Sequence, residues 1–153
     1  MQSTRPTVLA LDLEGTLISN AMSQIPRPGL FEFLSRCHAL FPRVVMFTAV
    51  AEEKFRTIAR LLVEERMVPE WYSTIEYIRW QGKTKDLNFI PGVHPRDALL
   101  VDDFEEFVHP GQESQWLQVE YFDYPYPDTD SGLAKMLKLL EQYGDIRLTL
   151  PSN

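Results

Sequence analysis

Short apolar runs recur along the sequence, and polar residues follow them. The clearest runs lie at 8–11, 44–47 and 98–101 and contain only apolar residues. Continuous apolar runs of this length are typical of strands that are buried on both faces of a sheet. Two further strands are expected at 74–80 and 117–121. The former alternates more, so we place it nearer an edge of the sheet.

Helical periodicity appears between these runs. Apolar residues recur at intervals of three or four positions in the segments 30–41, 55–62 and 133–140. A residue that ends helices follows each segment: Pro42, Pro69 and Gly144. A loop and a short helix are expected within 82–90. The alternation of strands and helices predicts a three-layer, Rossmann-like α/β fold: a parallel sheet of about five strands, with helices on both faces.

Composition narrows the class of protein. The chain has 153 residues, of which 44% are hydrophobic and 24% charged, as expected for one globular domain spanning 1–153. The net charge of −7 disfavours binding to nucleic acid or to an anionic membrane. One cysteine, Cys37, excludes an intrachain disulfide. No apolar run approaches the roughly 18 residues of a membrane span, and the first residues lack a signal-peptide pattern. We therefore expect a cytoplasmic protein.

The polar residues at the strand ends suggest a site. Asp12, Thr48 and the pair Asp102–Asp103 each follow an apolar run. In open parallel sheets, ligands bind outside the carboxyl ends of the strands. Converging carboxylates repel each other unless a cation lies between them, and hard oxygen ligands suit Mg²⁺. A carboxylate can also act as a nucleophile. Taken alone, the acidic residues are equally compatible with an ordinary turn or cap, and Thr48 fits a helix cap better than a site. The prediction therefore depends on the ordered set.

Sequence motifs add a family resemblance. The segment L-A-L-D-L-E-G-T-L-I-S resembles the first motif of the haloacid dehalogenase (HAD) superfamily, D-x-D-x-T after a strand. Further segments resemble the capless branch that contains the phosphatases of the RNA polymerase II C-terminal domain, which are FCP/SCP-like and NLI-interacting-factor-like. In chain order they are R-P-G-L-F-E-F-L, V-V-M-F-T-A-V, G-K-T-K-D-L and L-L-V-D-D-F. The resemblance implies a HAD-like fold without a large cap domain, and a magnesium-dependent phosphatase.

The resemblance also implies roles for matching residues. Asp12 would attack phosphorus and form an aspartyl-phosphate. Glu14 would act as general acid and base, and its backbone carbonyl would bind Mg²⁺. Asp12, Asp102 and Asp103 would complete the metal site. The substrate would be a phosphorylated protein or small molecule.

A second set of residues would recognise the phosphate. The resemblance implies that Thr48 and Ala49 bind phosphoryl oxygens. Lys85 would neutralise the phosphate and Asp12, and Lys83 is the alternative. The intervals between these motifs are filled by the expected helices and strand, which leaves no room for a large cap.

Glu14 is a departure, because the family has Asp at this position. Its extra methylene would displace the acid, and a shift of about 1 Å can cost roughly 10²-fold in rate. Normal activity, slow turnover with a longer-lived phosphoenzyme, and loss of catalysis all remain open. A phosphatase acting on small metabolites or nucleotides and a phosphate-binding interaction module are the alternatives. A phosphoryl-receiver domain is disfavoured by the order of the motifs. The pattern predicts no oligomeric state.

Overall fold

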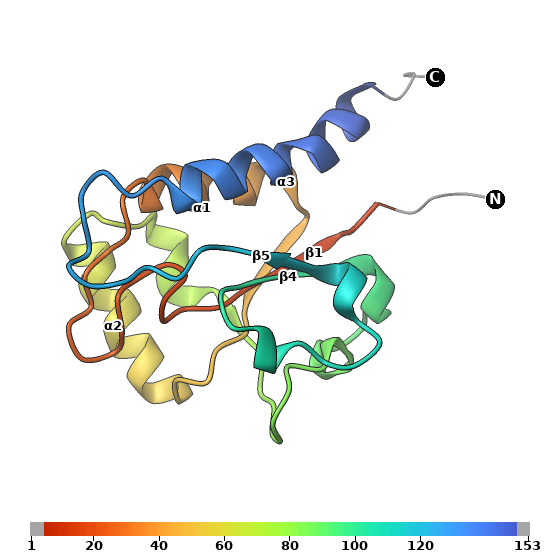
Figure 1. Cartoon of the computed structure of the whole chain (residues 1–153), viewed down its shortest axis with the longest axis horizontal. Helices are drawn as coiled ribbons and strands as arrows, with labels where there is room; N and C mark the ends of the chain where they lie inside the picture. The colour runs from red at the N-terminus through yellow and green to blue at the C-terminus, as the bar shows by residue number, and fades with distance from the viewer. Residues whose placement is uncertain (1–4, 150–153) are drawn as a thin grey trace.

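A computed structural model of the chain describes residues 5–149, with side chains as far as Tyr143. Five strands form one parallel sheet within this range (Figure 1). They are β1 (Val8–Leu11), β2 (Arg43–Met46), β3 (Glu76–Tyr77), β4 (Ala98–Asp102) and β5 (Trp116–Gln118). The α-helices are α1 (Leu30–Leu40), α2 (Glu52–Glu64) and α3 (Gly132–Thr149). Short 3₁₀-helices complete the connections: η1 (Glu70–Thr74), η2 (Leu87–Phe89), η3 (Pro95–Asp97), η4 (Glu105–Phe107) and η5 (Glu113–Gln115). This architecture confirms the predicted α/β fold.

The strand order β3-β2-β1-β4-β5 places β1 at the centre of the sheet. Leu11 of β1 pairs with Met46 of β2 on one side and with Val101 of β4 on the other, and both pairings are parallel. All residues of β1 are buried, as its apolar run predicted. The direction of strand addition reverses between β1 and β4. Such a switch point opens a crevice at the carboxyl ends of the two strands.

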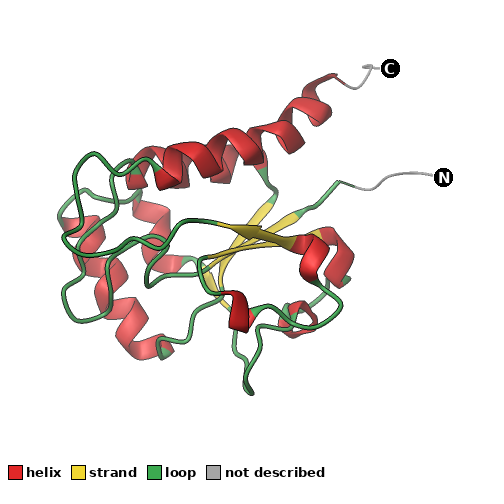
Figure 2. Ribbon diagram, viewed as in Figure 1, coloured by secondary structure: helices red, strands yellow, loops and turns green. Residues whose placement is uncertain are grey.

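Alternate residues of β1 face two different layers. Leu9 and Leu11 belong to the core cluster that also contains the buried sides of α1, α2 and α3. Val8 and Ala10 belong to a second cluster, which is covered by the segment around η2. Figure 2 shows α1 and α3 together on one side of the sheet and short helices on the opposite side. Helices cover both faces as predicted, but those on the second face are single 3₁₀ turns.

The apolar stripes of the helices face the core as their spacing predicted. The buried residues of α1 and α2 are Leu30, Phe33, Leu34, Cys37, Phe55, Ile58, Ala59 and Leu62. The first turn of α2 carries Glu52 and Glu53 near the positive end of the helix dipole. The sequence pattern therefore determined the type and the orientation of both helices.

Several elements differ from their predicted bounds. The strand expected at 117–121 is β5, which spans Trp116–Gln118. The strand expected at 74–80 contains only Glu76–Tyr77, because the residues after Pro69 form η1 first. It is an edge strand, as predicted. Helix α3 continues past Gly144 to Thr149, since an isolated glycine costs a helix only about 1 kcal/mol. The connections between the described elements contain no inserted cap domain, which agrees with the resemblance.

No helix among the described residues is sufficiently long and apolar to cross a membrane.

Candidate active site

The carboxyl ends of the central strands carry polar side chains. Asp12 directly follows β1, and Asp102 is the last residue of β4. The pairing of Leu11 with Val101 places these two carboxylates beside each other, and the Asp12 backbone N–H donates to the Val101 carbonyl at 3.0 Å. Thr48 lies two residues beyond β2, on the other side of β1. The parallel register therefore brings residues from three separate motifs to one edge of the sheet.

The Lys85 ammonium lies between the two buried carboxylates. Its Nζ donates to Asp12 Oδ1 at 2.9 Å and to Asp102 Oδ2 at 2.5 Å. Lys85 is anchored by a 2.7 Å hydrogen bond from its backbone N–H to the Phe107 carbonyl, and its Nζ lies 4.5 Å from the Phe107 ring centroid. A buried ammonium is costly unless it is paired, and the two carboxylates satisfy it. Lys83, the alternative lysine, is exposed.

The loop after β1 adds a hydroxyl to this cluster. Thr16 Oγ1 lies 2.8 Å from Asp12 Oδ2 and 3.1 Å from Asp103 Oδ1. The approach of this loop depends on Gly15, which has a φ of 76°. A Cβ atom at Gly15 would lie 2.9 Å from Asp103 Oδ2 and 2.7 Å from the Tyr121 ring. Only glycine fits at this position without displacing its neighbours.

Three carboxylates form a candidate cation site. Oxygen atoms of Asp12, Asp102 and Asp103 lie within 4.8 Å of one another. These are the hard ligands that Mg²⁺ prefers, and Mg²⁺ commonly binds through one or two carboxylates together with waters and phosphate. Lys85 is the only ammonium paired with this cluster within residues 5–143. A divalent cation would balance the remaining negative charge, so the residues present fit the group.

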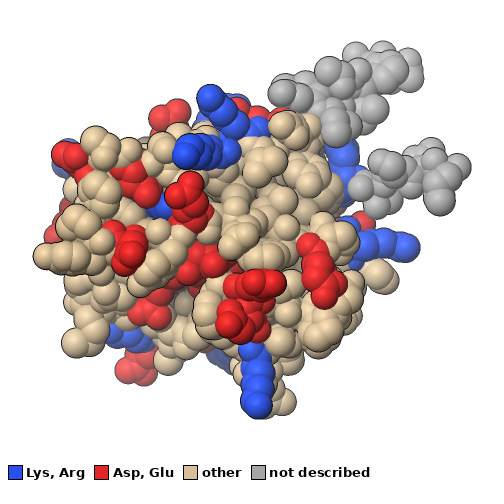
Figure 3. Space-filling model, in the orientation of Figure 1, with Lys and Arg blue, Asp and Glu red and all other residues tan. Residues whose placement is uncertain are grey.

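Asp and Glu side chains predominate across the middle of the face shown in Figure 3, whereas Lys and Arg lie mainly towards its periphery.

Burial and neighbouring charges raise the pKa of two of these carboxyl groups, those of Asp102 and Asp103. Burial is the main cause for Asp102; repulsion by Asp12 adds to it, Lys85 opposes it, and the pKa rises to about 6. Burial also raises the pKa of Asp103 to about 7, aided by its hydrogen bond to Asp12 and by the neighbouring charges. Burial alone would lower the pKa of Lys85, but attraction by Asp12 and Asp102 outweighs it and raises the pKa. Lys85 is therefore charged at neutral pH.

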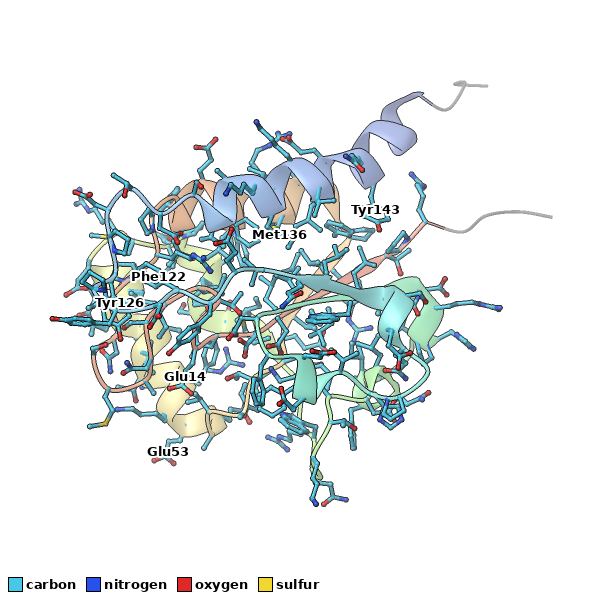
Figure 4. The ribbon with its side chains drawn as sticks, in the orientation of Figure 1. Glu14, Glu53, Phe122, Tyr126, Met136 and Tyr143 are labelled. Atoms are coloured by element: carbon cyan, nitrogen blue, oxygen red, sulfur yellow. The ribbon has the colours of Figure 1, made fainter. Side chains whose placement is uncertain are left out.

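Glu14 occupies the second acidic position of the motif, but its carboxylate lies outside the carboxylate cluster. The side chain is exposed, and Oε2 accepts a 2.7 Å hydrogen bond from the Ala21 backbone N–H. Figure 4 shows Glu14 on the loop that follows β1. In this conformation, the backbone of its own loop holds the group that the resemblance designates as general acid.

Thr48 and Ala49 border an open cavity of about 520 Å³. Thr48 is buried, and its Oγ1 accepts a 3.0 Å hydrogen bond from the Val50 backbone N–H. Among the hydrogen bonds of residues 5–143, none uses the Thr48 hydroxyl as donor. That proton is available for a phosphoryl oxygen. Ala49 is exposed and can offer only its backbone.

Thr16 is absent from the predicted site, although its hydroxyl contacts two of the carboxylates. The signal for it was present, since Thr16 stands at the threonine of the D-x-D-x-T motif.

Arg27 is a second contributor that the sequence pattern did not single out. Its Nε and Nη2 donate to the Asp130 carboxylate at 2.7 and 3.1 Å. Its Nη1 donates to the carbonyls of Gly15 and Thr16 at 3.3 and 3.2 Å. The guanidinium also lies 5.3 Å from the ring centroid of Phe122, which Figure 4 labels. This buried arginine ties the loop after β1 to the start of α3.

Comparison with known proteins bears on the family and the fold of the chain. The family model of the NLI interacting factor-like phosphatases matches residues 7–147. No curated protein matches the sequence. Among solved structures, a variant of the fission yeast RNA polymerase II CTD phosphatase Fcp1 bound to beryllium fluoride matches with a TM-score of 0.55 and 11% identity. The match covers 93% of this chain and 51% of that chain. The present chain thus spans about half the length of the Fcp1 chain, and at this identity the likeness supports the fold. Because the family model spans most of the sequence, the chain belongs to the family of NLI interacting factor-like phosphatases, as its motifs predicted.

Proposed function

We propose that the chain hydrolyses phosphate monoesters with the aid of Mg²⁺, through a phosphoenzyme on Asp12. The observation that carries this proposal is the setting of Asp12 at the switch point. Lys85 holds one of its carboxylate oxygens at 2.9 Å, and Thr16 holds the other at 2.8 Å. A carboxylate fixed in this way is suited to nucleophilic attack on phosphorus. Membership of a phosphatase family supports the same class of reaction.

The proposed reaction has two steps. In the first, an Asp12 oxygen forms a bond to phosphorus while the bond between phosphorus and the leaving oxygen breaks. Lys85 neutralises charge on Asp12 and on the phosphoryl group, and the Thr48 hydroxyl donates a hydrogen bond to a phosphoryl oxygen. In the second step, water attacks the aspartyl-phosphate at phosphorus, which releases phosphate and regenerates Asp12.

Asp12, Asp102 and Asp103 would hold the Mg²⁺, with the backbone carbonyl of Glu14 as a further predicted ligand. When bound, the ion would supply the positive charge that lets an anionic phosphate approach an anionic nucleophile.

The position of Glu14 supports a second candidate function. As general acid, Glu14 would protonate the leaving oxygen, and its carboxylate must leave the Ala21 N–H to do so. If it stays there, the pocket would bind phosphate, or keep it on Asp12, without rapid turnover. The chain would then act as a phosphate-binding interaction module.

A phosphorylated protein side chain is the substrate class that we propose, because no cap domain among the described residues closes the crevice. Small phosphate esters, including nucleotides, are the alternative. The single, buried cysteine fits the proposed cytoplasmic location.

The test is phosphate release from p-nitrophenyl phosphate with and without Mg²⁺. We expect hydrolysis that requires the metal and that falls at least about 10³-fold in Asp12→Asn, since the amide cannot serve as nucleophile. Asp128→Asn is the matched control, because Asp128 is exposed and far from the cluster in sequence. It should retain full activity.

Two outcomes would contradict the proposal. Activity that survives in Asp12→Asn would exclude Asp12 as nucleophile. Absence of both hydrolysis and phosphoenzyme formation in the wild type would exclude the enzyme and leave the binding module.

A further inference from the structure

The open cavity of about 520 Å³ begins at Thr48 and extends towards β3. The register of β1 and β2 ends with Leu11 opposite Met46, so Asp12 and Thr48 both lie just beyond the paired residues, at the same edge of the sheet. A phosphoryl group at Asp12 would therefore lie at the edge where this cavity begins. Tyr77 and Trp80 line the cavity. The volume is within the usual range for small-ligand sites, about 300–1,000 Å³.

The polar atoms of the two aromatic residues in the cavity are already hydrogen-bonded within the protein. The Tyr77 hydroxyl donates to the Val50 carbonyl at 2.5 Å, and Trp80 Nε1 donates to the Thr48 carbonyl at 2.8 Å. Both rings are fixed by these bonds and offer apolar surface rather than free donors. Such surface favours an apolar ring, which prefers offset or edge-on contact with aromatic side chains.

The reacting groups themselves are recessed. Asp12 is 5% exposed, and Lys85 and Asp102 are fully buried. A phosphate ester must therefore deliver its phosphorus below the surface. A flat, rigid group between the phosphate and the rest of the substrate can span that depth, whereas a short alkyl ester brings the substrate backbone against the rim.

A second, independent observation concerns the leaving group. The Glu14 carboxylate is exposed and is held by the Ala21 N–H, outside the carboxylate cluster, so the acid that the motif would supply is turned to its own loop. A phenol has a pKa of about 10 and can leave as its anion. An alkyl alcohol is a much weaker acid, close to water, so its oxygen leaves readily only with a proton from an acid.

We propose that this cavity is the leaving-group subsite and that it takes an aryl phosphate monoester, the chemistry of phosphotyrosine. An Asp12 oxygen bonds to phosphorus, the bond from phosphorus to the aryl oxygen breaks, and the phenolate leaves with the electron pair. Water then protonates it. The aryl ring rests against Trp80 and Tyr77. This inference rests on the proposed function, and it adds the substrate class.

The first test measures binding without chemistry. Benzylphosphonate and methylphosphonate share the anionic head, and calorimetry gives the affinity of the wild-type protein for each in the presence of Mg²⁺. Burial of the ring should make benzylphosphonate bind about 10- to 100-fold more tightly. Equal affinities would overturn the assignment of the cavity.

Two variants test whether the preference for benzylphosphonate arises in this cavity. Ala51 lines the rim of the cavity at the N-cap of α2, so Ala51→Phe narrows it without removing any hydrogen bond of the site. This variant should lose most of the preference for benzylphosphonate. Ala39→Phe is the matched control, because Ala39 is exposed on α1 and does not line the cavity. It should keep the wild-type preference, and a loss in both variants would contradict the proposal.

The second test compares kcat/KM for one peptide carrying phosphotyrosine or phosphoserine at the same position, together with free phosphotyrosine. We expect the phosphotyrosine peptide to exceed the phosphoserine peptide by at least about 10²-fold. Equal or reversed rates would overturn the inference while the proposed function stands. Loss of all hydrolysis would instead count against the proposed function, and the phosphonate affinities would still test the cavity. Preference for the peptide over free phosphotyrosine would identify proteins as the source, and the reverse would identify small aryl phosphates.

Discussion

Glu14 carries one methylene more than the aspartate of the family motif, and its carboxylate reaches the Ala21 N–H at 2.7 Å. The shorter side chain in Glu14→Asp would lose this bond and keep the acid nearer to the loop that holds Asp12. General acids typically contribute about 10²- to 10⁴-fold. We expect Glu14→Asp to increase kcat for alkyl phosphates about 10-fold, with a much smaller change for aryl phosphates. Single-turnover kinetics on both substrate types measure this difference.

Stability provides the control for that variant. The lost hydrogen bond is exposed, so the free energy of unfolding should fall by less than about 1 kcal/mol. A large drop in activity towards alkyl phosphates, at unchanged stability, would show instead that the site is built around Glu14.

Part of the site could be predicted from individual residues, because the register of parallel strands fixes which strand-end side chains lie next to each other. Asp12 and Asp102 had to meet once β1 and β4 were adjacent strands. The orientation of Glu14 could not be predicted, since it depends on one backbone N–H in an irregular loop. The role of Arg27 was also out of reach, because its partner Asp130 is 103 positions away in the sequence.

Among the elements, the start of α3 bears directly on the loop that carries Asp12 and Thr16. Gly132 is its first residue, and a Cβ atom there would overlap the Arg27 guanidinium. Gly132→Ala should therefore displace Arg27 from the Gly15 and Thr16 carbonyls. We expect a loss of about 1–3 kcal/mol in the free energy of unfolding and a fall in kcat that exceeds any change in KM. Urea denaturation and steady-state kinetics measure the two effects.

A substitution at a second glycine, Gly92, is the control that distinguishes steric overlap with Arg27 from backbone strain. Gly92 has a φ of 75°, and a Cβ atom there would meet nothing within 4 Å. Gly92→Ala should lower stability through its backbone conformation while kcat stays unchanged. A similar fall in kcat in both variants would argue against a positioning role for Arg27.

Elements were easier to predict than their bounds. Periodicity located α1 and α2 because each buries one stripe of apolar residues. The predicted bounds of β3 were wrong because the chain forms η1 directly after Pro69 and because this edge strand pairs with β2 alone. The short helix expected within 82–90 is η2, but η3, η4 and η5 were not predicted, because short 3₁₀ turns leave no periodic pattern.

For the whole molecule, the carboxylate cluster links stability to pH and metal. The pKa values of Asp102 and Asp103 are about 6 and about 7, against an ordinary value of 3.8. Folding favours their protonated forms, so their contribution to stability is full below about pH 4 and is lost as the pH rises through 6 to 7. Mg²⁺ favours the charged forms. Saturating Mg²⁺ should thus raise Tm by about 5 °C or more at pH 7.5, and by less at pH 5.

Differential scanning fluorimetry at constant ionic strength measures these shifts. Asp103→Asn should reduce the response to Mg²⁺, and Asp128→Asn should retain it. If Mg²⁺ leaves Tm unchanged at both pH values, the metal site is excluded.

The central position of β1 has a consequence for biosynthesis. During synthesis, β1 stays unpaired until its neighbours on both sides are made, and the second of them, β4, follows about 90 residues later. Arg27 stays without its partner for longer, because Asp130 is made after β4. In a nascent chain, the motif around Asp12 would therefore stay unassembled until the segment that carries Asp130 has been synthesised. We expect no catalysis by a polypeptide that lacks this segment.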